Sequence, residues 1–465
     1  MKSPDYTPLL TELADEHRRR SPRSATIHER AKQHLIDGGS HGIRLSEPFP
    51  PRITEAHGGW MVDEDGHRIL DLWQGHMANV LGHNPEVVTS ALSEAFDRGF
   101  GTQSGMVDEL QAELAELICR LTDAEKLRFT TSGSLSTMYA VLMARSFTGR
   151  GTVIKAGGGW HGAHPMLLKG VAYRDDGVGF EGVDSKGLPS SLTDRIVVTR
   201  YNDPQCLVED FAAVSDDLAC LILEPMLGAG GAIAATTEYL TLARKLCTKH
   251  GALLILDEMI TGFRFHPGGL GALHGVKPDL AIYGKALGGG MPVAAVAGRA
   301  EVMAEAGRAT GPRVAFSGGT YSAHPASMLA SRVFLEYLDD HASEIYPRLG
   351  EIGESMRRGI ESVFAEAGIL ARCTGAVDEL DSGSSMVTIH FPHEQTTVLD
   401  TPEAVFDPER CDIELREIVL GPALLVEDVH LLLAHGAAST AHTLDDVAFL
   451  SEACRRSATR FARHR

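Results

Sequence analysis

Two side chains with complementary chemistry follow strongly apolar runs in the middle of the sequence. Asp257 ends the run at 252–257, and Lys285 directly follows the run at 279–284. Ligands of parallel sheets bind at the carboxyl ends of the strands, so we expect both groups at one sheet edge. A partly desolvated lysine can act as a nucleophilic amine toward a carbonyl group. Taken alone, an aspartate after a strand more often caps a helix or turn, and a lysine after glycine more often lies in a solvated loop.

Hydroxyl and aromatic side chains occupy similar positions after two other predicted strands. Ser132, Gly133 and Ser134 lie between a strand at 127–131 and a helix at 134–147, where backbone N–H groups suit a phosphate. Trp160 and His161 follow a strand at 152–156 and three glycines, and an indole there can stack on a flat ring. Alone, a Ser-Gly-Ser turn or a tryptophan is more often structural.

These groups together are more specific than any one of them. A lysine amine, a carboxylate for a pyridine nitrogen, a phosphate cup and a stacking aromatic are what pyridoxal 5'-phosphate requires. Nucleotide loops are not supported, because Asp279 stands where a phosphate-binding loop needs glycine and Ala286 where it needs serine or threonine. The sequence has no His-Glu-x-x-His pattern, and we expect no metal.

The elements that must position these residues alternate between strand and helix. Such alternation predicts an α/β fold in which helices cover both faces of a mostly parallel sheet. A turn dipeptide, Asp65-Gly66, indicates a hairpin near 60–72. Further strands are expected at 219–225, 292–298 and 386–391, and helices at 238–250 and within 85–121.

The length of 465 residues exceeds what one hydrophobic core usually supports, so at least two lobes are expected. We predict an N-terminal arm and small-domain segment over 1–75, a large cofactor-binding domain over 76–335, and a small α+β domain over 336–465. The pattern changes near residue 335 from alternating elements to long helices with few strands.

Charge and composition exclude several classes of protein. With 43 Lys and Arg against 62 Asp and Glu, the net charge is −19, which disfavours nucleic acid as a partner. No apolar run is long enough to span a membrane, and no signal peptide is recognisable. The 7 cysteines form no Cys-x-x-Cys pair, which favours a reducing cytoplasm.

The order and spacing of these segments resemble a known family. The stretch LLILDEMITGFR with KPDLAIYGKALGGGMPVAAVAG resembles the signature of class III, fold type I, pyridoxal-phosphate aminotransferases. The chain is most similar to the glutamate-1-semialdehyde aminomutase branch, over residues 28–455. The segments that carry this likeness are GGSHGIR (38–44), GHRILDLWQGHMANVLGHNPEVV (66–88), RYND (200–203), LEP (223–225) and GTYSAHP (319–325). The resemblance implies a mostly parallel, seven-stranded sheet in the large domain.

The resemblance also assigns roles to individual residues. Lys285 matches the lysine that holds the cofactor as a Schiff base, and Asp257 the carboxylate that pairs with the pyridine nitrogen. Ser132, Gly133 and Ser134 match the phosphate cup. For the ring, Trp160 and His161 match an aromatic-histidine pair in which tryptophan replaces tyrosine, Met259 a side chain packed on the opposite face, and Asn202 a residue near the ring hydroxyl.

Two further matches concern partners. Thr320 matches a threonine that reaches the phosphate in the partner subunit, so the resemblance implies a homodimer with shared active sites. Arg44 matches an arginine that binds a substrate carboxylate, a task that suits a planar guanidinium. The expected small-molecule partners are an amino donor and an amino acceptor.

The sequence departs from the family pattern at positions that face the substrate. Leu135 replaces the glutamate of the family's Ser-Gly-Thr-Glu-Ala, Gly157 replaces an acid, and the segment before Ala441 lacks a glutamate. These departures disfavour glutamate-1-semialdehyde aminomutase activity but leave the catalytic pair intact, so an aminotransferase is the first hypothesis. An intramolecular aminomutase, or an isomerase or racemase of that type, is the second. A non-catalytic paralogue is the third, and the presence of both Lys285 and Asp257 disfavours it.

Overall fold

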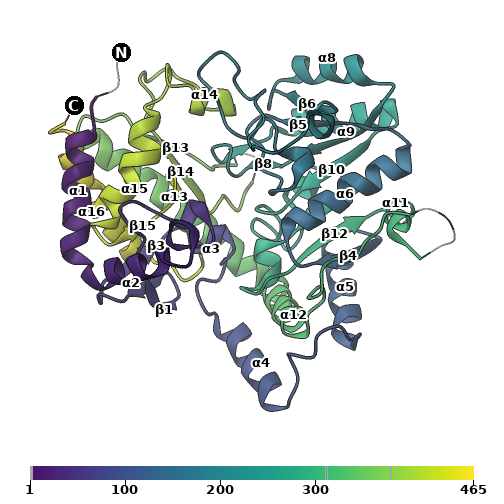
Figure 1. The fold of residues 1–465 in the computed structure, drawn as a ribbon, viewed down its shortest axis with the longest axis horizontal. Helices are drawn as coiled ribbons and strands as arrows, with labels where there is room; N and C mark the ends of the chain where they lie inside the picture. The colour runs from purple at the N-terminus through teal and green to yellow at the C-terminus, as the bar shows by residue number, and fades with distance from the viewer. Residues whose placement is uncertain (1–3, 309–310, 312, 378–379, 465) are drawn as a thin grey trace.

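The computed structural model describes residues 4–308, 311, 313–377 and 380–464. Its largest element is a seven-stranded sheet with the order β4-β12-β11-β10-β7-β5-β6 (Figure 1). Strand β12 runs antiparallel to β11 and β4, and the other paired strands are parallel, which confirms the predicted α/β class. The strands are β4 (Lys126–Thr130), β5 (Thr152–Ala156), β6 (Ile196–Thr199), β7 (Leu218–Leu223), β10 (Leu253–Asp257), β11 (Leu280–Tyr283) and β12 (Ala294–Gly298).

Alternating side chains of the central strands pack against helices on both faces of this sheet. On β7, Cys220 and Ile222 share a core with α6 (Gly133–Thr148). Leu221 and Leu223 point the other way, toward a core built with α8 (Pro204–Val214) and α9 (Thr237–His250). Burial on both faces explains why these strands read as continuous apolar runs.

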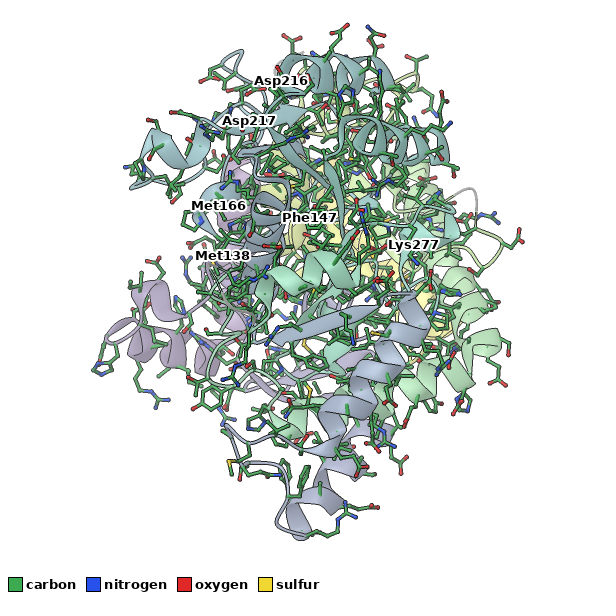
Figure 2. All side chains as sticks on the ribbon, turned by 90° about the vertical axis from the view of Figure 1, so that its right-hand side faces the viewer. Met138, Phe147, Met166, Asp216, Asp217 and Lys277 are labelled. Atoms are coloured by element: carbon green, nitrogen blue, oxygen red, sulfur yellow. The ribbon has the colours of Figure 1, made fainter. Side chains whose placement is uncertain are left out.

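The remaining part of the sheet is covered by helices that follow the hairpin region and the strand β12. They are α4 (Glu86–Asp97), α5 (Glu109–Thr122) and α12 (Pro325–Asp340), which share a core with Ala281 and Tyr283 of β11. The helical pattern predicted within 85–121 is therefore two helices. In Figure 2 the labelled Met138 and Phe147 of α6 lie on the side that faces the viewer, and Met138 and Met166 pack against the same core cluster.

The two ends of the chain build a second core beside the large sheet. Leu9 of α1 (Thr7–Arg20) is buried in one cluster with Phe364 and Phe461 from the C-terminal region, and the two ends lie together in Figure 1. Arg460 pairs with Glu16 at 2.7 Å across this contact. The core also contains the helices α13 (Ala342–Glu366), α15 (Leu420–Leu425) and α16 (Leu444–Phe461).

Two smaller sheets accompany this second core. One has the order β1-β2-β3-β15 and includes the predicted hairpin, and the other has the order β13-β14-β16. Their strands are β1 (Ile53–His57), β2 (Trp60–Asp63), β3 (Arg68–Asp71), β13 (Arg372–Thr374), β14 (Met386–His390), β15 (Val429–His430) and β16 (His435–Ala437). Since α12 crosses residue 335, that boundary falls inside a helix, and the division at 75 and 335 stays a prediction.

Shorter elements complete the described structure. They are α2 (Pro22–Lys32), α3 (Gln74–Met77), α7 (Ser190–Thr193), α10 (Leu270–Leu273), α11 (Ala300–Met303), α14 (Pro402–Phe406), β8 (Met226–Leu227) and β9 (Ile233–Ala234), with single turns of 3-10 or π helix at Ile36–Gly38, Gly42–Arg44, Pro165–Leu167, Lys285–Gly288, Ala304–Ala306 and Leu415–Val419. No helix within the described ranges has the length and apolar character needed to cross a bilayer.

Candidate active site

A cavity of about 700 Å³ lies at the carboxyl ends of the central strands. It brings together side chains that are far apart in the sequence, from β10, the turn after β11, the loop after β5 and the first turn of α6. The sequence-predicted residues that line it are Arg44, Ser132, Gly133, Ser134, Trp160, His161, Asp257, Met259 and Lys285. Nine of the eleven predicted site residues therefore meet in one place.

Two hydrogen-bond donors fix the orientation of the Asp257 carboxylate. Its Oδ2 accepts a hydrogen bond from Nδ1 of His161 at 2.8 Å, and its Oδ1 accepts one from the backbone N–H of Met259 at 3.0 Å. Asp257 and His161 are each only 2% exposed. Burial lowers the pKa of His161 against the opposing effect of Asp257, which favours a neutral ring with its proton on Nδ1.

Lys285 begins a 3-10 turn one residue beyond Gly284, which follows β11, and lines the same cavity. Its φ of 47° is unusual for a residue with a side chain, and such backbone concentrates at functional sites. Burial lowers the pKa of its amine, while the charges of Asp257 and Glu224 oppose that shift. A lowered pKa increases the fraction of free amine, which is the form that attacks a carbonyl carbon.

The start of α6 forms a cradle that requires two glycines. A Cβ atom on Gly133 would lie 2.6 Å from Cε of Met259. Gly162 has a φ of +85°, and a Cβ there would lie 2.4 Å from Oγ of Ser134. Helix α6 has 16 residues, so its N-terminus presents free N–H groups and partial positive charge to the cavity. This cradle fits a phosphate group.

Trp160 is 40% exposed, and its backbone is tied to a carboxyl group that sequence reasoning did not single out. Glu224 directly follows β7, and its two oxygens accept hydrogen bonds from the N–H of Trp160 at 2.9 Å and of Gly228 at 3.0 Å. Burial and the negative charge of Asp257 raise its pKa to about 8. Its place just after an apolar strand, like that of Asp257, was the signal that could have found it.

Two other unpredicted residues line the cavity beside Arg44. The rings of His41 and His76 are in contact at a tilt of 54°, with centroids 4.9 Å apart, and Nε of Arg44 donates to Nε2 of His76 at 2.8 Å. The exposed Arg44 thus stands at the cavity with an imidazole on one side. A guanidinium in such a position can bind a carboxylate.

Asn202 and Thr320 lie outside the lining of this cavity. The Asn202 amide bonds to the carbonyls of Ala234 and Asp400, each at 3.0 Å, and its contact near a cofactor ring stays a prediction. Thr320 lines a separate cavity of about 800 Å³ beside β4 and α5, and its role toward a partner subunit also stays a prediction.

The cavity lies in a chain whose sequence matches a known family. Residues 44–375 match the family described as aminotransferase class-III. The chain belongs to this family. Class III aminotransferases bind pyridoxal 5'-phosphate, and the solved structures similar to the chain include fold type I transaminases. The cavity fits that group, because it combines an amine, a buried carboxylate and a glycine-lined helix N-terminus.

Sequence relatives and solved structures point to two branches of the family. The chain is 35% identical to glutamate-1-semialdehyde 2,1-aminomutase 2 of Lachnoclostridium phytofermentans, over 82% of the chain and 86% of that protein. It is 31% identical to the aminomutase of Methanosphaera stadtmanae, over 91% and 95%. Its fold superposes on an omega-transaminase from Sphaerobacter thermophilus with a TM-score of 0.85 and 28% identity, over 96% and 99%.

Proposed function

We propose that this class III enzyme is an aminotransferase that moves an amino group between a carboxylate-bearing amino acid and a keto acid or aldehyde. The observation that carries the proposal is the meeting of Lys285, Asp257 and Arg44 in one cavity. The first two supply the chemistry of an amine and an anion, and Arg44 supplies a cation for the substrate.

Each residue has a defined task in this proposal. When bound, pyridoxal 5'-phosphate supplies a ring that withdraws electrons from the substrate carbon. Asp257, oriented by His161, would keep a proton at the ring nitrogen. The amine of Lys285 would hold the cofactor and later carry a proton at Nζ to and from the substrate carbon. The first turn of α6, with Ser132 to Ser134, would hold the phosphate, and the indole of Trp160 would cover the ring.

An intramolecular aminomutase is the second candidate, and a specific observation favours it. The relatives that cover most of the chain at 31–36% identity carry that name. An isomerase or racemase would use the same groups. A mutase retains its diamine intermediate in the closed site, whereas a transferase releases one product before it binds the next substrate.

We further propose a cytoplasmic homodimer with shared active sites. The support is the cavity that holds Thr320, which opens beside the exposed apolar side chains Met106 and Val107. A partner subunit covering this surface would remove apolar area from water and bring Thr320 near the second site.

The test is a scan of amino donors with and without amino acceptors. We expect a donor alone to bleach the visible absorbance of the cofactor once, and donor with acceptor to turn over repeatedly. Product formed from one substrate without any acceptor would instead identify the mutase or isomerase. If no donor reacts, the chain is a non-catalytic member of the family.

Lys285→Ala provides the matched control for this scan. The variant should bind the cofactor without the absorbance band of the Schiff base and should lose about a hundredfold to ten-thousandfold in turnover, since both attachment and proton transfer need the amine. Borohydride followed by peptide mapping should label Lys285 in the parent. Label on a different lysine would refute the assignment.

A further inference from the structure

The segment that follows β3 contains four consecutive residues with left-handed backbone. Gln74, Gly75, His76 and Met77 have φ values of 45°, 62°, 62° and 64°. Three of them carry a Cβ, and each such residue pays roughly 1–2 kcal/mol in this conformation. Backbone of this kind persists only where its surroundings enforce it, and it concentrates at functional sites.

Buried charged side chains hold both ends of this turn. The carboxylate of Asp71, 2% exposed, accepts hydrogen bonds from the N–H groups of Trp73 at 3.0 Å and Gln74 at 2.9 Å. At the other end, the guanidinium of Arg264, 1% exposed, donates to the carbonyl of Met77. The turn is therefore a fixed part of the cavity wall.

The turn delivers the imidazole of His76 to the cavity, next to Arg44. Nε of Arg44 donates to Nε2 of His76 at 2.8 Å. A guanidinium Nε always carries its hydrogen, so Nε2 must be the acceptor and the ring must be neutral. Burial, followed by the positive charge of Arg44, lowers the pKa of His76 to about 4, which agrees with that state.

This contact decides which edge of the guanidinium is available. Arginine can bind a carboxylate through Nε and one terminal nitrogen, or through both terminal nitrogens. His76 occupies Nε. Within the part of the chain that the structure describes, the terminal nitrogens of Arg44 have no hydrogen-bond or ion-pair partner, so they alone are left for a ligand.

We propose that His76 is a positioning residue that fixes Arg44 so that its two terminal nitrogens bind the carboxylate of the amino substrate end-on. This inference rests on the proposed function, because it presumes a carboxylate-bearing substrate. Without His76 the guanidinium can turn, and each orientation that does not face the substrate reduces the affinity for its carboxylate.

The test compares holoenzyme variants at position 76. Each keeps a side chain on the left-handed backbone, but they differ in whether that side chain can accept the hydrogen bond from Arg44. His76→Leu removes the acceptor, whereas His76→Gln supplies a carbonyl oxygen in its place. Binding of butanoate is measured by calorimetry, and half-reactions are followed with 3-aminobutanoate and with sec-butylamine, which lacks the carboxylate. His57→Leu, on β1 and outside the cavity lining, serves as the control.

We expect His76→Leu to weaken butanoate and to raise KM for 3-aminobutanoate about tenfold, equivalent to about 1.4 kcal/mol. The limiting rate and the reaction of sec-butylamine should stay within about twofold, and His76→Gln should restore most of the affinity. A parent that binds no butanoate, or a His76→Leu variant that binds it normally, would overturn the inference. A parent that binds butanoate but converts no amino donor would instead refute the proposed function.

A double-mutant cycle separates positioning from a structural role. In the Arg44→Gln background, His76→Leu should change butanoate affinity less than about twofold, because its partner is already gone. If the two substitutions instead weaken butanoate independently, so that their fold-changes multiply, His76 does not act through Arg44.

Discussion

Three carboxyl groups lie at the carboxyl ends of the neighbouring strands β7 and β10, and their surroundings separate their roles. Asp257 lines the cavity and is oriented by His161. Glu258, the next residue, is turned away and accepts hydrogen bonds from the N–H groups of Leu270 at 2.9 Å and Gly271 at 2.8 Å. Glu224 joins the loop of Trp160 to that of Gly228. A position at the end of a strand therefore identifies carboxyl groups that could act in the site. The hydrogen-bond donors around each one determine whether it faces the cavity or holds a loop.

The raised pKa of Glu224 predicts how stability depends on pH. Its pKa rises from 4.5 to about 8 on folding, so the folded state holds a proton that the unfolded state releases. This contribution to stability is complete below about pH 4.5 and is lost as the pH rises toward 8, by roughly 1.4 kcal/mol per pH unit. Glu224→Gln should flatten the decline in Tm of the cofactor-free protein over that window. Equal slopes in parent and variant would contradict this assignment, and Glu116→Gln, exposed on α5, should keep the parent slope.

At the scale of elements, the site depends on how closely the loop after β5 approaches the first turn of α6. The N–H of Ala163 donates to Oγ of Ser134 at 3.1 Å, next to Gly162. Buried Lys155 supports the same loop by donating to the carbonyls of Gly159 at 2.9 Å and Lys169 at 2.8 Å. The loop and the helix thus form one wall that carries both the aromatic ring and the phosphate cradle.

This close approach predicts different effects for two glycine substitutions. Gly162→Ala places a methyl group 2.4 Å from Oγ of Ser134, whereas Gly177, with a φ of +87°, has no atom within 4 Å of the same methyl position. Both variants carry the backbone penalty, and Gly162→Ala should cost about 1–3 kcal/mol more because of the overlap. Thermal unfolding and cofactor titration measure this. If the two variants are equally stable and bind the cofactor equally well, the loop and the first turn of α6 can move apart without cost, and the expectation is wrong.

Strong local patterns made much of this fold predictable. The strands β10 and β11 and the helices α6 and α9 agree with expectation to within one or two residues, because both faces of the strands are apolar and the helices have clear ends. The strand β6, which lies at the edge of the sheet and is only partly buried, was not predicted.

The site was predictable where a residue stands directly after a strand, and not where distant contacts place it. The left-handed turn that carries His76 contains one glycine, and nothing local signals its shape. Asp71 holds one end of the turn from nearby in sequence, but the other end is held by Arg264, which lies 187 residues from Met77. Likewise, the bond between Arg44 and His76 spans 32 residues.

The molecule as a whole is negatively charged, whereas the cavity contains two basic side chains. The net charge is −19, yet Arg44 and Lys285 line the cavity, so the attraction of an anionic substrate must be local. Because solvent screens such attraction beyond about 8 Å at physiological salt, affinity for a carboxylate depends on the few cations in the cavity. The acidic surface as a whole contributes to solubility rather than to selection of the substrate.

The exposed apolar surface near Thr320 predicts a dimer. It also predicts that cofactor binding depends on dimer formation. Met106 is 68% exposed and Val107 is 89% exposed beside the cavity that Thr320 lines. If a second subunit covers this surface, charges placed there must be buried on association and should weaken the dimer by more than about a hundredfold. We expect light scattering to give twice the mass of one chain for the parent and a single chain for the double variant Met106→Asp, Val107→Asp.

Loss of the dimer should also lower cofactor retention, because each Thr320 is predicted to complete the phosphate site of the partner subunit. Val398→Asp, a 62% exposed position after β14, introduces the same charge elsewhere and should leave mass and cofactor content unchanged. Thr320→Ala should lower cofactor affinity without changing the mass, since it removes one hydroxyl but no apolar contact area. A parent that is monomeric and keeps its cofactor would show that each chain holds the phosphate alone, with the first turn of α6 sufficient for the task.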